Sequence, residues 1–334
     1  MLNIIDQIPA GLLDTPAPEL HTLLPGPTLL HLPGLRSRPM FVSVLLHGNE
    51  HTGWEAVRRL LAGYAGRRLP RAVSVFIGNI EAARYNQRFL DHQPDYNRIW
   101  GTGETPEHKM MQQVVSEMKQ REVFLSIDIH NNTGKNPHYA CVNNTYSRYL
   151  QLAILFSRTV VYFIRPKGVQ SMTFAELCPA VTVECGTSGD SNSTRHALDF
   201  LVRCLELEAL SDHTVSSQHI DLYHTVAIVK IPGSINFGFD DGDHDLCFDK
   251  GIEKFNFREL PEATVMGRVR PGIERVLDIL DEQGNEVGEQ YFCIEDGKLR
   301  TRRSIVPAMI TVNTDVIRKD CFCYIMERYP MTHE

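Results

Sequence analysis

Phe41-Val42-Ser43-Val44-Leu45-Leu46-His47-Gly48-Asn49-Glu50 is the stretch on which both the fold and the candidate site depend. It joins an apolar, strand-like run to a histidine and a glutamate three residues apart, and a helix-like segment follows. A histidine and a carboxylate that leave the carboxyl end of a strand can supply two ligands to a zinc ion. Because such pairs are also ordinary polar loop residues, the reading as a metal site needs a further ligand.

A third candidate ligand is His130, which ends the apolar run 125–130 and enters a loop with Gly134. Catalytic zinc usually keeps three protein ligands, and His47, Glu50 and His130 fit that pattern. Asp128 lies two residues earlier, on the same face of a strand as His130. It either orients the imidazole or only hydrogen-bonds a nearby turn.

Another strand-like run, residues 180–184, ends in Glu184. A carboxylate at the end of a central strand is expensive to bury without a task. Its obvious task beside a metal is that of general base for a water molecule. The alternative is a surface glutamate at a strand terminus.

The loop-like segment 85–100 carries Arg88 and Arg98. The planar guanidinium presents a fork of donors that matches a carboxylate or a developing oxyanion. Both arginines are therefore candidates to face a substrate, although a solvated loop would also contain arginines.

The order of these residues resembles the succinylglutamate desuccinylase and aspartoacylase family, within the zinc carboxypeptidase superfamily. The matching runs are HGNE at 47–50, RFLDHQPDYNR at 88–98, DIHNNTG at 128–134 and VECG at 183–186. The resemblance implies one zinc ion per chain, with the ligands His47, Glu50 and His130.

The same resemblance implies roles for four other residues. Glu184 is expected to be the general base and proton shuttle, and Arg88 to polarise the scissile carbonyl. Asn97 and Arg98 are expected to bind a carboxylate of the substrate.

One departure from the family concerns the substrate. Aspartoacylases place an arginine about ten residues before the general base, where this chain has Phe174. Unless Arg165 or Lys167 supplies that charge, we expect poor activity on N-acetylaspartate and N-succinylglutamate.

Composition limits the class of protein. With 334 residues, 43% of them hydrophobic, the chain can form one large domain and a smaller one. Its 41 acidic and 34 basic residues give a net charge of −7, which argues against nucleic acid as a partner. The amino terminus lacks a basic start, and there is no long apolar run; we therefore expect a cytoplasmic protein without membrane contact.

The pattern along the chain predicts an α/β domain with a largely parallel sheet flanked by helices, followed by a smaller β-rich domain. We expect the catalytic domain to span residues 1–214 and the β-rich domain to span residues 215–334, capping the active site. The runs that alternate in the first part are 41–46, 53–64, 72–77, 107–119, 123–129, 149–156, 160–164, 181–184 and 194–210. The short strands expected in the second are 225–231, 264–268, 275–279, 291–294 and 322–326.

The function that these features favour is a zinc-dependent deacylase that hydrolyses the amide bond of an N-acyl amino acid or a similar small amide bearing a carboxylate. Two alternatives stay open: a metallocarboxypeptidase that acts on a small peptide, and a zinc-binding protein without catalysis. The sequence does not fix the acyl group, the amine portion or the oligomeric state, so a homo-oligomer is also open.

Overall fold

The computed structural model describes residues 1–240 and 242–331. The chain forms two compact units. Unit 1 comprises Met1–Asn131 and His138–Asp221, and unit 2 comprises Asn132–Pro137 and Leu222–Pro330. No helix in the described part of the chain is long and apolar enough to cross a membrane.

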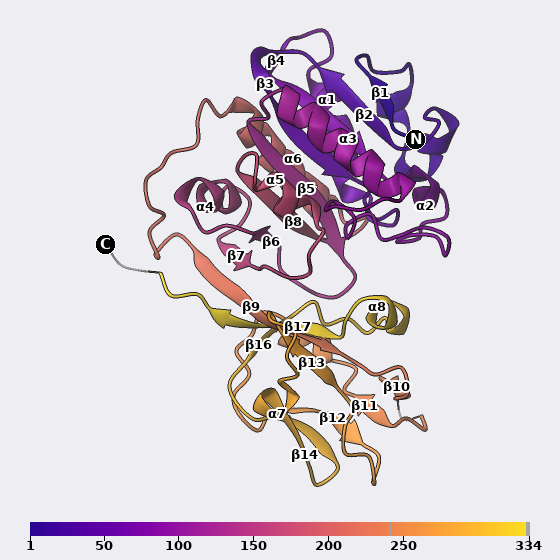
Figure 1. Ribbon diagram of the computed structural model, residues 1–334, viewed down its shortest axis with the longest axis vertical. Helices are drawn as coiled ribbons and strands as arrows, with labels where there is room; N and C mark the ends of the chain where they lie inside the picture. Colours follow the sequence, from indigo (N-terminus) through magenta and orange to yellow (C-terminus); the bar gives the residue numbers. More distant parts are fainter. Residues whose placement is uncertain (241, 332–334) are drawn as a thin grey trace. The chain divides into compact units, whose positions relative to one another are not determined.

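Unit 1 is built on a mixed, largely parallel sheet, as the sequence predicts (Figure 1). Its strands lie in the order β1-β2-β4-β3-β5-β8-β6-β7. The central strand β3 is parallel to both of its neighbours, β4 and β5. Their bounds are β1 Asn3–Ile5, β2 Thr28–Leu32, β3 Gly34–Val44, β4 Leu69–Ile77, β5 Leu125–Asn132, β6 Tyr139–Val142, β7 Thr159–Tyr162 and β8 Ala180–Thr187.

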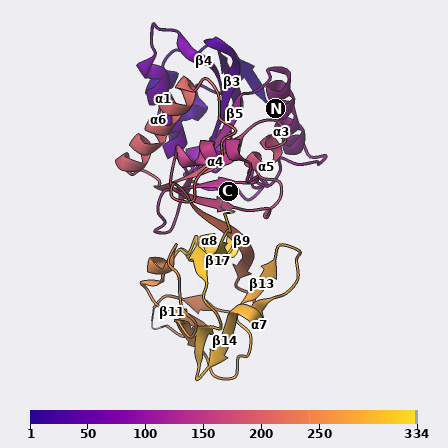
Figure 2. The same ribbon diagram turned by 90° about the vertical axis from the view of Figure 1, so that its left-hand side faces the viewer.

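Helices cover both faces of this sheet. Figure 2 shows α1 and α6 on one side of β3, β4 and β5, and α3 and α5 on the other. The helices of unit 1 are α1 Thr52–Gly63, α2 Ile80–Arg84, α3 Pro106–Gln120, α4 Ser147–Ile154, α5 Gln170–Phe174 and α6 Ser191–Glu206, with 3-10 turns at η1 Leu12–Asp14 and η2 Ala17–Thr22. The run 149–156 therefore lies mainly in a helix.

The sequence of α3 explains its position. Thr105 caps the helix by accepting a hydrogen bond from the backbone N–H of His108, and Pro106 occupies the first turn. Its buried residues recur every three or four positions, so that one stripe faces the sheet. These residues are Met110, Met111, Val114 and Met118.

Phe174 belongs to the core beneath α3 and is fully buried. Its ring stacks on Phe41 with the centroids 4.5 Å apart, and Trp100 meets it edge-on at 5.8 Å. The position ten residues before Glu184 is therefore occupied by a side chain that packs in the core.

Unit 2 is β-rich, and its largest sheet has the order β10-β11-β12-β15-β14. Strand β9 pairs with β17 and β13, and β16 pairs with β17. The strands are β9 Asp221–Lys230, β10 Phe237–Gly238, β11 Leu246–Phe248, β12 Val265–Val269, β13 Asp278–Asp281, β14 Phe292–Glu295, β15 Lys298–Thr301, β16 Val306–Ala308 and β17 Cys323–Arg328. Three short helical segments accompany them: η3 Ile252–Phe255, α7 Gly288–Tyr291 and α8 Thr314–Lys319.

One expected strand of unit 2, at residues 275–279, is shifted by about three residues. Most of the run 275–279 is irregular, and the strand β13 begins only at Asp278. Arg275 explains the difference, because its guanidinium bonds to the carbonyl of Leu277 and to the carboxylate of Asp278. These local bonds compete with strand pairing.

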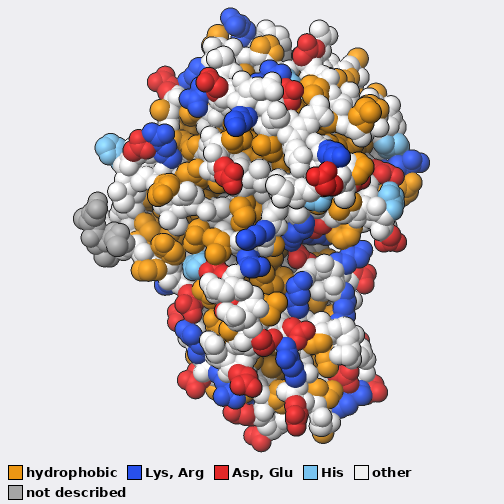
Figure 3. All heavy atoms as spheres, in the orientation of Figure 1, with side chains coloured by type: hydrophobic (Ala, Val, Ile, Leu, Met, Phe, Trp, Pro, Cys, Tyr) orange, Lys and Arg blue, Asp and Glu red, His pale blue; other side chains and the backbone are white. Residues whose placement is uncertain are grey.

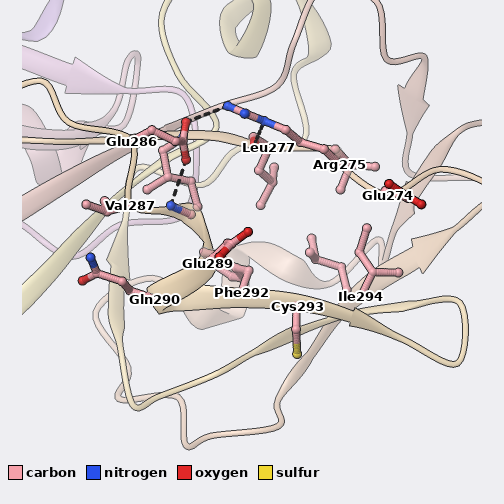
Figure 4. A pocket seen from close by; sticks show the side chains of 14 residues that line it. Glu274, Arg275, Leu277, Glu286, Val287, Glu289, Gln290, Phe292, Cys293 and Ile294 are labelled. Carbon is pink, nitrogen blue, oxygen red and sulfur yellow. Dashed lines mark hydrogen bonds and ion pairs between the residues drawn. The ribbon is translucent and has the colours of Figure 1, made fainter.

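Unit 2 also contains a cavity of about 380 Å³, whose lining combines apolar side chains, such as Ile279 and Phe292, with charged ones, such as Arg275 and Glu286. Figure 4 shows Arg275 reaching Glu286 across its rim, at a distance of 2.6 Å. On the surface of this unit, in the lower part of Figure 3, acidic and basic side chains are intermingled.

Candidate metal centre and active site

The turn after β3 brings His47 and Glu50 together. The backbone N–H of Glu50 donates to the carbonyl of His47 at 3.1 Å, which closes the turn. Gly48 is required here, because a Cβ atom would lie 2.3 Å from the backbone of Ala82 and Ala83 in α2. Leu45 adopts a left-handed conformation, with φ of 55°, and redirects the chain as it leaves the strand.

The structure places His130 beside this turn. His130 lies near the end of β5, and its Nδ1 is 2.7 Å from Oε2 of Glu50. The Nδ1 of His47 is 2.8 Å from the other carboxylate oxygen of Glu50. The three residues are 3–6% exposed, and each offers a ligand atom within 4.8 Å of the others. The cluster could therefore hold a metal ion.

Each imidazole is oriented by a second carboxylate. The Nε2 of His130 is 2.7 Å from Asp128, on the same strand face, and Asp128 in turn accepts a hydrogen bond from Ser43. The Nε2 of His47 is 3.0 Å from Asp95. Both rings therefore direct Nδ1 into the cluster, and the carboxylate on the Nε2 side holds each ring in this orientation.

Asp95, which the sequence does not mark as a site residue, contacts three groups of the site. Its carboxylate accepts from Arg88 at 3.1 Å and from the backbone N–H of Asn97 at 2.8 Å, besides its contact with His47. The residue is separated from His47 by 48 positions, and only its place two residues before Asn97 could have indicated it.

Asn131 is a second residue that the sequence analysis missed. Its backbone N–H donates to Glu50 at 3.1 Å, and its side-chain amide donates to Thr52 and to the carbonyl of Gly186, each at 2.9 Å. It ties together the start of α1 and the ends of β5 and β8, from which the site is built.

The charges of the cluster are strongly coupled. Burial alone would raise the pKa of Glu50, but His47 and His130 outweigh burial and hold that pKa well below its usual range. Burial lowers the pKa of both imidazoles, yet their carboxylate neighbours, Asp95 and Asp128 among them, raise it above the ordinary value. The site is thus arranged to favour positive charge among its carboxylates.

Glu184 lies on β8, next to β5 in the sheet, and is partly exposed as a residue. Burial of its carboxyl group, opposed by His130 and reinforced by Glu50, raises its pKa to about 7. Its Oε2 is buried and has no hydrogen-bond partner among the described residues. A carboxyl group of this kind exchanges protons near neutral pH.

The remaining expected site residues lie in the segment after α2. Arg88 is 3.8 Å from Glu50. Asn97 is buried; its Nδ2 lies 3.1 Å from Nε2 of His130, and its Oδ1 accepts from the backbone N–H of Gln170. Arg98 is half-buried and donates to the carbonyl of Asn97. Arg88 and Asn97 thus lie at the cluster, and Arg98 lies beside Asn97.

The fold and the cluster together define an α/β protein with a two-histidine, one-carboxylate centre at the ends of its strands. The family model of the succinylglutamate desuccinylase/aspartoacylase catalytic domain matches residues 38–204, and the chain belongs to this family of deacylating hydrolases. The match covers all seven residues that the sequence predicts for the site. A search of the curated proteins finds no match.

Solved structures share the fold over most of the chain. The succinylglutamate desuccinylase from Chromobacterium violaceum is 15% identical, with a TM-score of 0.57 over 89% of this chain and 86% of that one. Murine aminoacylase 3 is 16% identical, with a TM-score of 0.59 over 88% and 96%. The ectoine utilization protein EutE from Ruegeria pomeroyi is 17% identical, with a TM-score of 0.57 over 89% and 88%. The predicted family and fold class are confirmed.

Proposed function

We propose that the protein is a zinc-dependent amidohydrolase that removes the acyl group from an N-acyl amino acid or a similar small amide bearing a carboxylate. The observation that carries the proposal is the buried cluster of His47, Glu50 and His130 with the carboxyl group of Glu184 beside it. Membership of a family of deacylating hydrolases supports the reaction class.

The donor set suits a zinc ion. Two imidazole nitrogens and one carboxylate are the ligands found in many zinc hydrolases. Three carboxylates, those of Glu50, Asp95 and Asp128, surround two imidazoles, so a cation would balance the excess negative charge. Zinc held by these ligands would supply Lewis-acid chemistry, which polarises a carbonyl group and activates water.

Glu184 handles the proton in this proposal. With a pKa of about 7, its carboxylate accepts a proton from the attacking water and its carboxylic acid returns that proton to the leaving amine. The free Oε2 is the atom available for both transfers, because no other described group bonds to it.

The arginines act on the charges of the substrate. Arg88 lies along the edge of the cluster, where its guanidinium would stabilise the negative charge that develops on the carbonyl oxygen. Asp95 fixes its orientation. Arg98, with the side chain of Asn97, would bind the carboxylate of the substrate.

The test is release of primary amine from N-acetyl amino acids, N-succinyl amino acids and dipeptides, with the wild-type protein and Glu184→Gln. Glu206→Gln, an exposed change at the end of α6, is the matched control. We expect wild type and control to hydrolyse at least one acyl amino acid, and Glu184→Gln to lose turnover while its zinc content stays the same. Equal rates in the wild type and Glu184→Gln would refute the proposal, and preference for dipeptides would favour a peptidase.

A further inference from the structure

A second cavity lies in unit 1 at the opposite ends of the strands from the metal cluster. It has a volume of about 610 Å³ and is lined by the segments that precede or begin β3, β4, β5 and β8. From Arg38 in this cavity, β3 runs six residues to Val44, which is roughly 20 Å at the usual rise of a strand. The cavity is therefore separate from the candidate active site.

Four arginines line this cavity: Arg36, Arg38, Arg71 and Arg148. The exposed Arg148 has a counter-charge, because it pairs with Asp212 at 2.6 Å. Within residues 1–240 and 242–331, none of the other three forms an ion pair with a carboxylate. Three guanidinium groups thus share the cavity with a single acidic lining residue, Glu208, and none of the three is paired with its carboxylate in the described part of the chain.

Arg71 is the most constrained of the three, with only 3% of the residue exposed. Its guanidinium donates to the carbonyls of Arg38 and Leu207, at 2.9 and 2.8 Å, and stacks 3.6 Å from the centre of the Phe124 ring. Its buried Nε has no hydrogen-bond partner among the described residues, and the same holds for Nε of Arg36. Backbone carbonyls and one aromatic ring thus stabilise this charge only in part.

The arginines also repel one another. Burial, followed by the charges of Arg36 and Arg38, lowers the pKa of Arg71 to about 10. Arg38 also lies near enough to the buried Cys178 for its charge to affect that thiol. A bound anion would relieve this repulsion, and the guanidinium of the exposed Arg38 would donate hydrogen bonds to it.

We propose that this cavity binds a small oxyanion with at least two negative charges, carried by phosphate or by several carboxylates. Arg36 and the exposed Arg38 line its outer part, and the buried Arg71, stacked on Phe124, lines its inner part. If the arginines had a purely structural role, they would only donate to the neighbouring backbone carbonyls. Arg71 does donate to such carbonyls, so its contacts fit both roles. The two roles differ in one respect: only the anion-binding role makes the protein bind an anion saturably.

The experiment is calorimetric titration of the full chain with inorganic phosphate, pyrophosphate and citrate, at an ionic strength held constant with sodium chloride. The first variant is Arg38→Gln, at an exposed position on the rim. The second is Ser37→Glu, which adds a negative charge to the same rim and leaves every arginine in place. Arg59→Gln is the matched control, since it removes an exposed charge from α1, outside the cavity.

We expect saturable binding by the wild type and by Arg59→Gln, weakened at least about tenfold in both rim variants, which is about 1.4 kcal/mol. Tighter binding of pyrophosphate indicates a phosphorylated ligand, and tighter binding of citrate a polycarboxylate. Anion binding at the metal cluster would be unaffected by either rim variant. Absence of saturable binding for all three probes, or unchanged binding in Ser37→Glu, would overturn the proposal.

Discussion

Asp95→Asn is the substitution for which the structure gives the most specific expectation. The change preserves the size of the side chain but removes a charge that contacts His47, Arg88 and the backbone N–H of Asn97 at 3.0, 3.1 and 2.8 Å. His47 then loses the carboxylate that orients its ring, and Arg88 loses a counter-charge.

The expected loss of zinc affinity follows from the role of a carboxylate that hydrogen-bonds a metal-binding histidine. Loss of a hydrogen bond behind a ligating histidine typically weakens metal binding by about 10–100-fold, or about 1.4–2.7 kcal/mol. We expect a loss of this size in zinc affinity, measured by competition with a chromogenic chelator. Asp91→Asn removes the same charge from an exposed position in the same segment, and we expect it to change the affinity by no more than about twofold.

The comparison between these two variants decides whether the reasoning holds. If Asp95→Asn binds zinc as tightly as Asp91→Asn, then Asp95 does not orient His47 in the metal-bound protein. A weaker affinity in both variants to the same extent would show only a general effect of charge.

Three further predictions concern other parts of unit 1. Glu184→Gln should lower turnover by about 10²–10⁴-fold, and wild-type activity, measured across pH, should fall toward acidic pH as Glu184 becomes protonated, because the carboxylate is the form that accepts the proton. His31 has a pKa lowered to about 4 by burial and Arg121, against an ordinary 6.5, so the folded state resists its protonation. Its contribution to the free energy of unfolding is therefore present above pH 6.5 and is lost, by up to about 3 kcal/mol, as the pH falls toward 4. In urea unfolding between pH 7 and 5, His31→Gln should lose less of this free energy than the wild type. Phe174→Ala should destabilise the protein by about 3–5 kcal/mol in urea unfolding, and a loss below about 1 kcal/mol would contradict its position in the core.

The sequence predicts the central part of the fold well because the signals there are local. The run that ends at Val44 is apolar and is followed by a turn and an amphipathic helix, so strand, turn and helix can all be recognised from neighbouring residues. The alternation of such units implies a parallel sheet, and a parallel sheet gathers the ends of its strands at one edge. That is why His47 and His130 could be paired across more than eighty residues.

The parts that the sequence did not predict depend on contacts between distant segments. Asp95 lies in a loop whose path no local pattern fixes, and its partner is 48 residues away. Phe174 was considered for the substrate site only by counting back from Glu184, but packing against Phe41 and Trp100 places it in the core. The arginines of the second cavity come from three separate segments, β3, β4 and α4, and none of those segments carries a motif.

The most direct test of the account is the metal content of the protein purified without added zinc, compared with that of His130→Ala. His196→Ala, which changes a partly buried histidine on α6, is the matched control. The account predicts about one zinc ion per chain in the wild type and the control, and loss of that zinc in His130→Ala. Absence of zinc from the wild type, together with no binding when zinc is added, would contradict the proposed metal centre and the hydrolase built on it.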